Sequence, residues 1–341
     1  MMSNKPLPLL AAALLALSTA PALAAPAYTV TRSVPLGAPD RWDYVVYSHE
    51  TGRVYVAHGD RLSVIDASSG EVVGQVEGIA GGAHGTAISL ATGQGFTDDG
   101  RNGLALAFDL KTLKIAKQIP ADKDADGIAV DSVSGHVFVI EGDPASLTVI
   151  DPKTDAVVAV IKAGEKLEYG AGDGHGSIFV AGEEKRDLLK IDARTNAVVA
   201  RWPTPDCTSP HGLAVDPEHH RAFMGCVNST MVVVDTTTGA QVAKLPIGRG
   251  NDAVAYDPKR KRVFSSNGLD GTISVFRQVT PDKYEALDTL TTAISGRTMD
   301  VDPESGRLFV AASDVDPPTT PGGRPHPKPG TLRLMMLDPI P

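Results

Sequence analysis

Short apolar segments alternate with polar turns along almost the whole chain, and one pattern recurs seven times. Each copy is an apolar strand, a polar turn that usually holds Asp and Gly, and a second strand with a central aromatic residue, as in AVDSVSGHVFVIE from Ala129. A helix would show a period of about 3.6 residues, and these segments do not. Equivalent turn positions are 41, 42, 42, 43, 41 and 45 residues apart, at Ser48, Ser89, Asp131, Asp173, Asp216, Asp257 and Asp302.

A second sequence segment follows each of the first five copies and completes the repeat. LTVIDPKTDAVV from Leu147 is an example: a strand, a turn opened by Asp, and another strand. A period near 42 residues with four short strands predicts an all-β fold, a seven-bladed β-propeller of four-stranded antiparallel blades. The seventh copy lacks its fourth strand, and YTVTRSVPLG from Tyr28 matches the missing one. We therefore expect the N-terminal strand to close the last blade.

The amino-acid sequence of the repeats also resembles that of a known family. The relevant segments are VFSSNGLDGTISVF from Val263, LTVID from Leu147, and the strand cores VYVAH, VFVIE and LFVAA. In these segments the chain resembles the YncE-like family of periplasmic seven-bladed β-propellers with YVTN-type repeats, from about Tyr28 to Pro341. The resemblance implies the fold, and it implies no set of catalytic residues.

The N-terminal segment has the features of a secretory signal. Lys5 is followed by the apolar run 7–17 and by Ala22-Leu23-Ala24, a typical cleavage site. The alternative is a membrane anchor, but the run is too short to span a bilayer and Pro21 interrupts it. We expect residues 1–24 to be a signal peptide and 25–341 to be one propeller domain, soluble in the periplasm or secreted.

The charge and composition of the chain limit which classes of partner are expected. The formal net charge is −9, and no run of basic residues interleaved with aromatics occurs, so nucleic acid is not a favoured partner. No further stretch is long enough to predict a membrane span. We expect a monomer that binds a small molecule or another periplasmic protein.

Cysteine usage points to a structural bond. Cys207 and Cys226 are the two cysteines of the chain, and neither belongs to a C-x-x-C or C-x-x-C-H motif. Structural zinc, thioredoxin chemistry and covalent haem are therefore disfavoured. Strand directions place both residues at one end of blade five, so we expect a disulfide in an oxidising compartment.

An aspartate recurs after the third strand of six repeats. Such carboxylates could form a metal array, or each could accept backbone N–H bonds in its own tight turn, and we expect the turn role. These residues are Asp66, Asp109, Asp151, Asp192, Asp235 and Asp338.

One position of the repeat carries candidate chemistry. We call "top" the face of the ring where each innermost strand begins and each second strand ends. Near the start of the innermost strands all seven equivalent residues are ionisable, and we call them the channel ring: Asp43, His84, Asp126, Glu168, His211, Asp252 and Arg297. Because a propeller arranges equivalent positions around one axis, we expect them to line one polar cavity at the channel mouth, with each histidine between two neighbouring carboxylates.

The channel ring has two interpretations. Carboxylates beside a histidine favour its protonated form and fix its tautomer, so the ring could bind a cationic ligand or provide an acid/base pair. It could also hold a divalent metal cofactor through His84 and His211. Alternatively, the seven residues form a salt-bridged, water-filled plug.

A long loop, residues 314–330, separates the second and third strands of the last blade. It leaves from the top face and carries Arg324, His326 and Lys328. Long loops in compact folds are often functional, so this one could cover the channel ring as a partial lid. The alternative is a proline-rich excursion without a role at the site.

Together these features favour a binding or interaction protein with a polar ligand or metal site at the top mouth of the channel. The alternative is a metal-dependent hydrolase, lactonase or lyase that uses the same site. Neither a nucleophile elbow nor a short metal-ligand motif occurs in the sequence, so we assign no catalytic residue. A third possibility is a scaffold whose loops bind another protein or peptidoglycan.

Overall fold

The computed structural model describes Met1 and residues 28–320 and 325–340. The expected signal segment 1–24 and Arg324 of the expected lid lie outside the described residues. Within those ranges the one helical element is a short 3-10 turn, η1 (Gly100–Asn102). No helix in the described part of the chain is long and apolar enough to cross a membrane.

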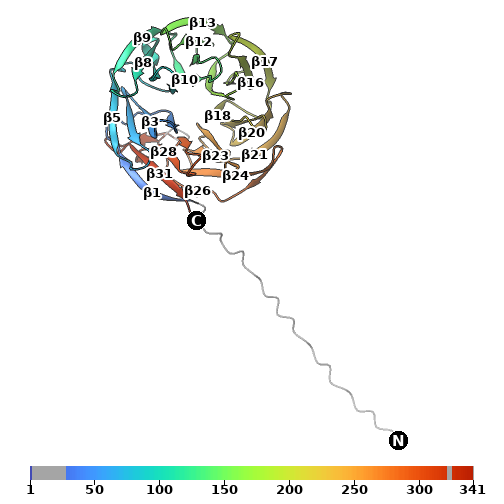
Figure 1. Cartoon of the computed structure of the whole chain (residues 1–341). Coiled ribbons are helices and arrows are strands. Elements are labelled where there is room, and N and C mark those ends of the chain that lie inside the picture. The colour runs from blue at the N-terminus through green and yellow to red at the C-terminus, as the bar shows by residue number, and fades with distance from the viewer. Residues whose placement is uncertain (2–27, 321–324, 341) are drawn as a thin grey trace.

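Seven antiparallel sheets surround one axis and form a seven-bladed propeller (Figure 1). The innermost strands of the blades are β2 (Val45–Ser48), β6 (Thr86–Ser89), β10 (Ala125–Val130), β14 (Leu167–Gly172), β18 (Pro210–Asp216), β22 (Val254–Asp257) and β27 (Thr298–Val301). The second strands are β3 (Arg53–His58), β7 (Gln94–Asp99), β11 (Val137–Glu141), β15 (Ser177–Gly182), β19 (Arg221–Cys226), β23 (Arg262–Asn267) and β28 (Leu308–Ala312).

The outer half of each blade consists of a third and a fourth strand. The third strands are β4 (Arg61–Asp66), β8 (Leu104–Asp109), β12 (Ser146–Asp151), β16 (Asp187–Asp192), β20 (Thr230–Asp235), β24 (Thr272–Thr280) and β31 (Arg333–Pro339). The outermost strands are β5 (Val72–Glu77), β9 (Ile115–Pro120), β13 (Ala156–Lys162), β17 (Ala197–Pro203), β21 (Gln241–Pro246), the pair β25 (Lys283–Ala286) and β26 (Leu290–Thr291), and β1 (Tyr28–Pro35).

The N-terminal strand closes the last blade, as the repeats predicted. β1 pairs antiparallel with β31, from Tyr28 opposite Pro339 to Pro35 opposite Arg333. In Figure 1 the blue first strand lies beside the red last one. Blade seven therefore combines the two ends of the described chain, and β31 has no open edge.

The core is divided among the blade interfaces. Seven clusters of buried apolar residues occur, one between each pair of neighbouring blades. Each second strand contributes one fully buried aromatic, and burial of such a side chain stabilises the fold by roughly 1.5–3 kcal/mol. These aromatics are Tyr55, Phe96, Phe138, Phe179, Phe223, Phe264 and Phe309.

Two details differ from the simple repeat. Blade six has a broken outer edge, because β24 extends past Arg277 and pairs with both β25 and β26. Five of the recurrent aspartates accept turn N–H bonds as expected: Asp66, Asp109, Asp151, Asp192 and Asp235. Asp338 instead accepts bonds from Arg307 and Thr31.

Candidate functional site

Irregularities in strand register orient the side chains of three channel-ring residues. Asp126, Glu168 and His211 lie where the register of the innermost strand shifts against the second strand. Such β-bulges bend the strand and redirect a side chain. The other four ring residues lie one or two positions before their strands: Asp43, His84, Asp252 and Arg297.

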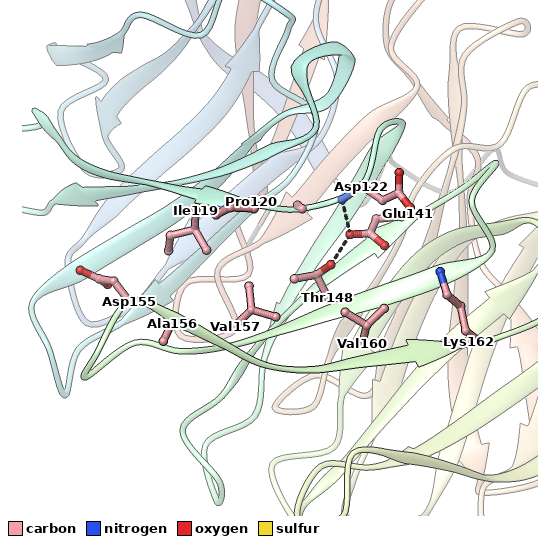
Figure 2. A pocket seen from close by; sticks show the side chains of 11 residues that line it. Ile119, Pro120, Asp122, Glu141, Thr148, Asp155, Ala156, Val157, Val160 and Lys162 are labelled. Atoms are coloured by element: carbon pink, nitrogen blue, oxygen red, sulfur yellow. Dashed lines mark hydrogen bonds between the residues drawn. The ribbon is translucent and has the colours of Figure 1, made fainter.

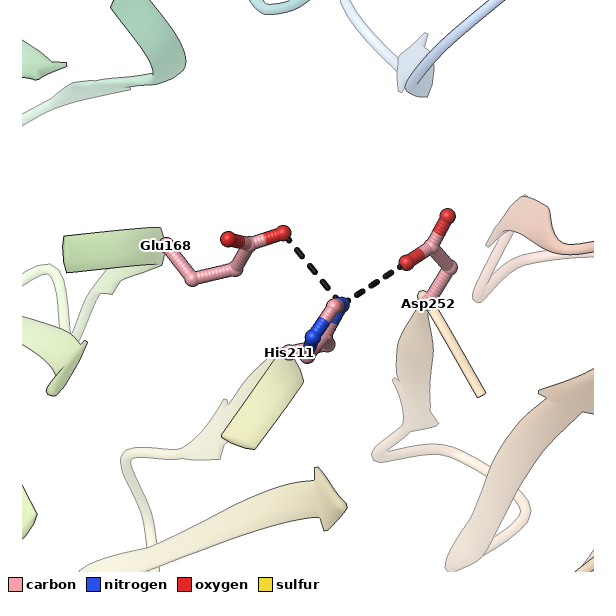
Figure 3. Close-up of side chains that lie close together, drawn as sticks. All are labelled: Glu168, His211 and Asp252. Atoms are coloured by element: carbon pink, nitrogen blue, oxygen red, sulfur yellow. Dashed lines mark hydrogen bonds and ion pairs between the residues drawn. The ribbon is translucent and has the colours of Figure 1, made fainter. Parts of the chain in front are cut away.

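His211 stands between carboxylates of the two neighbouring blades (Figure 3). Its Nδ1 is 3.0 Å from Asp252 Oδ1 and 3.3 Å from Glu168 Oε1. All three side chains are at most 15% exposed. Among the described residues, the one cluster with metal-ligand spacing consists of these three, with ligand atoms within 4.8 Å of one another, and it leaves out His84.

The other nitrogen of His211 faces a polar chain. Nε2 is 3.3 Å from Ser209 Oγ, and this hydroxyl donates to Glu183 Oε1 at 2.8 Å. Glu183 also pairs with Lys166 at 3.0 Å. A serine hydroxyl has one hydrogen, so Ser209 Oγ accepts from Nε2–H of His211. Although burial opposes ionisation, Lys166 and Ser209 lower the pKa of Glu183.

The channel ring has a His211 half (Glu168, His211 and Asp252) and a His84 half (Asp43, His84 and Asp126). Arg297 connects the two through Asp252 and Asp43. Its Nη1 donates to Asp252 Oδ2, and its Nη2 is 3.7 Å from Asp43 Oδ2 and donates to the Trp42 carbonyl at 2.7 Å. Burial opposes ionisation of Asp252, but Arg297 and His211 lower its pKa to about 2. Asp252 is therefore a carboxylate at neutral pH.

The direct partner of His84 is a carboxylate of its own blade. Its Nδ1 is 2.7 Å from Oδ2 of Asp98, on the second strand of its own blade. Asp98 Oδ1 also accepts the backbone N–H groups of His84 and Gly85. Asp43 and Asp126 act on His84 at longer range, as charges that also favour its protonated form. Burial opposes the change, but Asp98 raises the pKa of His84 to about 9.

Arg41 also touches His84, with Nη2 3.2 Å from Nε2. A guanidinium donates to this nitrogen only when the imidazole is neutral. Because the buried Asp98 carboxylate favours the imidazolium, we expect the exposed Arg41 side chain to turn away from the protonated ring.

Two ring carboxylates have raised pKa values. Burial first, and then repulsion from Asp43, raise the pKa of Asp126 well above its usual range. Burial and the charges of Asp126 and Asp252 do the same for Glu168. Asp126 has no ion-pair partner among the described residues.

Two tyrosines meet across the channel beside the ring. The next position along the chain is small in five blades, at Gly85, Gly127, Gly212, Ala253 and Thr298, and is Tyr44 or Tyr169 in blades one and four. The centroids of the two tyrosine rings are 4.4 Å apart. Burial and the charge of Glu168 raise the pKa of Tyr44 well above its usual range, so its hydroxyl stays a donor.

The predicted disulfide is present between Cys207 and Cys226, with Cα atoms 5.3 Å apart. It ties the loop before β18 to the end of β19. The backbone N–H of Val227 donates to the Thr208 carbonyl at 3.0 Å, which reinforces this connection. The loop that carries Ser209 and His211 is therefore fixed to the second strand of its own blade.

The expected lid is partly described. Residues of the loop form a small hairpin, β29 (Val315–Asp316) with β30 (His326–Pro327). Lys328 pairs with Asp316 at 3.4 Å, and its backbone N–H donates to Asp314. In the described part of the loop, His326 and Lys328 make no hydrogen bond or ion pair with the channel ring.

Two hollows have linings that include none of the seven ring residues. One of about 640 Å³ runs between the outer strands β9 and β13 (Figure 2). Its buried Glu141 already accepts bonds from Thr148 and Ser146 and from the Asp122 backbone, so it offers little free hydrogen-bonding capacity. The other, of about 310 Å³, is lined by innermost strands of blades one to four and by Tyr169.

Sequence reasoning missed four groups around the site: Tyr44, Asp98, Glu183 and Ser209. Asp98 had a signal, because it is a carboxylate where blade five has Gly225 and blade one has Ala57. Ser209 had another, because it is a hydroxyl two residues before a ring histidine. Glu183 lies just beyond β15 and has no equivalent pattern in the other repeats.

Comparison with known proteins supports the family resemblance. No family model matches the chain. It is 25% identical over 212 residues to "Uncharacterized protein YncE" of Salmonella typhi and 24% identical over 212 residues to the Salmonella typhimurium protein of that name. The matches cover 60% of this chain and 57% of each relative, so the chain spans less than two thirds of the curated relatives it matches. With the seven blades, they confirm the YncE-like resemblance.

Solved structures share the architecture at lower identity. The U3-55K structure has a TM-score of 0.76 at 11% identity, over 92% of this chain and 98% of that one. A chain of Kuenenia stuttgartiensis hydrazine synthase has a TM-score of 0.69 at 14% identity, over 79% of this chain and 91% of that one. At these identities the similarity shows the fold alone.

Proposed function

We propose that this chain is an exported, periplasmic β-propeller that binds a small cation, organic or metallic, at the channel ring. Export is supported by the sequence of residues 1–24 and by the Cys207–Cys226 disulfide, a bond typical of oxidising compartments. The resemblance of the repeats to periplasmic YncE-like propellers agrees with this location.

One observation carries the proposal: the channel ring concentrates more buried carboxylate than its own cations balance. Asp126 lacks a cationic partner among the described residues, and Glu168 shares His211 with Asp252. Burying like charges together is unfavourable, and a bound cation removes that cost. The tyrosine hydroxyl of Tyr44 adds a hydrogen-bond donor beside the same carboxylates.

The proposal is tested by a thermal-shift screen of divalent metal ions and small amines, followed by calorimetry of each hit. We expect at least one cation to bind with one-to-one stoichiometry and to bind about tenfold more weakly to Asp126→Asn. Glu71→Gln is the matched control, because it removes one carboxylate charge from an exposed position on the rim. A wild-type protein that binds no cation of the panel, or an Asp126→Asn variant with unchanged affinity, contradicts the proposal.

A second candidate is a metal-dependent hydrolase, lactonase or lyase. The favouring observation is that Glu168, His211 and Asp252 supply three ligand groups from three blades, a number that leaves coordination positions for water or substrate. The test is hydrolysis of a lactone and ester panel with added metal and with a chelator. Activity that survives Glu168→Gln unchanged argues against this candidate.

A further inference from the structure

We infer that the channel ring holds a divalent first-row transition metal ion on one side, bound by His211 Nδ1, Glu168 and Asp252. We infer also that Ser209 and Glu183 position the imidazole of His211 for this ion. The inference rests on the proposed function, because it names the ligand of the same channel ring.

The distances from His211 Nδ1 to the two carboxylate oxygens fit an ion. With bonds of about 2.0–2.2 Å, neighbouring ligand atoms in tetrahedral or octahedral coordination lie roughly 3.0–3.5 Å apart. His211 Nδ1 is 3.0 Å from Asp252 Oδ1 and 3.3 Å from Glu168 Oε1. The ion takes the position of the hydrogen that Nδ1 directs at these oxygens. The Nδ1–H bond is replaced by a bond to the metal, and the proton leaves to solvent.

A contact at Nε2, on the other side of the imidazole from the metal ligands, sets the tautomer of His211. Ser209 gives its hydrogen to Glu183, so its oxygen accepts from Nε2–H. An imidazole that keeps its hydrogen on Nε2 presents the lone pair of Nδ1 to the ion. Metal-bound histidines usually donate their other N–H in this way, and that contact fixes the ring orientation.

The carboxylate ligands are also held in place. Arg297 occupies Oδ2 of Asp252 and leaves Oδ1 directed at His211. Glu168 reaches the same point from a β-bulge of the neighbouring blade. Two carboxylates balance the charge of a divalent ion, and the imidazole nitrogen favours Zn²⁺ or Mn²⁺ over Ca²⁺, which prefers oxygen ligands.

The backbone at Ser209 holds its hydroxyl between His211 and Glu183. Ser209 has a φ of 46°, a left-handed conformation that glycine adopts more easily than serine. The adjacent disulfide and the bond from Val227 fix this loop. A serine kept in this conformation, with its hydroxyl between His211 and Glu183, suits a positioning residue.

The ligand assignment is tested by calorimetric titration of the full propeller with ZnCl₂, with CaCl₂ as the contrast. We expect one zinc ion per chain, weaker calcium binding, and at least a tenfold loss of zinc affinity in Glu168→Gln. Glutamine keeps the size of the side chain, so the fold should be retained, and circular dichroism checks this. Zinc affinity unchanged in Glu168→Gln overturns the assignment.

The positioning role is tested by Ser209→Gly, which removes the hydroxyl and suits the backbone. We expect zinc affinity to fall about 10–100-fold and the absorption spectrum of the Co²⁺-substituted protein to change, at an unchanged metal-free melting temperature. Ser229→Gly is the control, because Ser229 has a similar φ of 55° in the same blade, away from the ring. Glu183→Gln keeps an acceptor for Ser209 and should retain most of the affinity. A Ser209→Gly protein with unchanged zinc affinity and Co²⁺ spectrum overturns the role.

Failure of the inference differs from failure of the proposed function. If wild-type protein binds an amine in an Asp126-dependent way but binds no zinc, the metal assignment is wrong and the proposed function stands. If neither class of cation binds, both are wrong.

Discussion

The two histidines of the channel ring occupy equivalent positions in blades two and five, yet they bind different partners. His84 uses Nδ1 for Asp98 of its own blade at 2.7 Å. His211 directs Nδ1 at carboxylates of the two neighbouring blades. Position in the repeat therefore decides where a side chain lies, and the residues around it decide what it binds.

The cause of the difference is one residue of the second strand. Two positions after the central aromatic, blade two has Asp98 and blade five has Gly225. A side chain at 225 would collide with the Asn251 amide, so blade five has no room for an equivalent carboxylate. His84 consequently pairs with a carboxylate of its own blade. His211 instead contacts carboxylates of both neighbouring blades, a set with metal-ligand spacing.

The largest expected effect is loss of the folded propeller, which would abolish the His211 half and the His84 half of the ring together. A chain that lacks residues 28–35 loses β1, exposes the edge of β31 and loses the buried side chains of Tyr28 and Val34. We expect no cooperative melting of the propeller in this variant. Circular dichroism compares it with a control chain that starts at residue 25. Equal melting temperatures for the two chains would show that β1 is dispensable for ring closure.

The next effect is confined to the His211 half. Replacing both cysteines, Cys207→Ala and Cys226→Ala, should lower the free energy of unfolding by roughly 2–4 kcal/mol, because the disulfide restrains the unfolded chain. It should also weaken cation binding at His211, since the loop with Ser209 loses its anchor. Urea unfolding and calorimetry measure the two effects, and His84 titration by NMR serves as the internal control. A shifted His84 pKa would mean that the two halves are not independent.

A smaller effect is confined to the His84 half. Asp98→Asn keeps the shape of a fully buried side chain but removes the charge that His84 contacts. We expect a loss of about 1–3 kcal/mol in the free energy of unfolding and a fall in the pKa of His84. Urea unfolding and NMR titration check both, with the exposed Glu71→Gln as control. Zinc affinity at His211 should change much less than in Glu168→Gln, and an equal loss would contradict the separation of the halves.

The smallest effect is on pH dependence. The pKa of His84 is raised from 6.5 to about 9, because Asp98 outweighs burial. Its contribution to stability is therefore complete below about pH 6.5 and is lost as the pH rises through about 9. Melting temperatures should fall over this range more steeply in the wild type than in Asp98→Asn. Parallel profiles would show that the Asp98 pair does not raise the pKa of His84.

Local patterns predicted much of this molecule. The blade aromatics, five of the six turn aspartates and the match of residues 28–35 to a missing fourth strand are features of single repeats, and the structure confirms them. The disulfide followed from strand direction at one end of blade five. Comparison of the repeats also selected the seven ring residues, five of which the structure joins by ion pairs: Asp43, Glu168, His211, Asp252 and Arg297. It did not identify Asp98 as the direct partner of His84.

The sequence by itself determined the blade count, the closure and which residues occupy equivalent positions in the blades, because these follow from a repeat period and from strand alternation. Only the tertiary structure decided that Asp98 holds His84, that Ser209 and Glu183 hold His211, and that Tyr44 meets Tyr169. Hydrogen bonds and metal ligation depend on separations of about 3 Å. Bulges, neighbouring side chains and the space left by residues such as Gly225 set those separations, and they act between segments that the repeat pattern treats as equivalent.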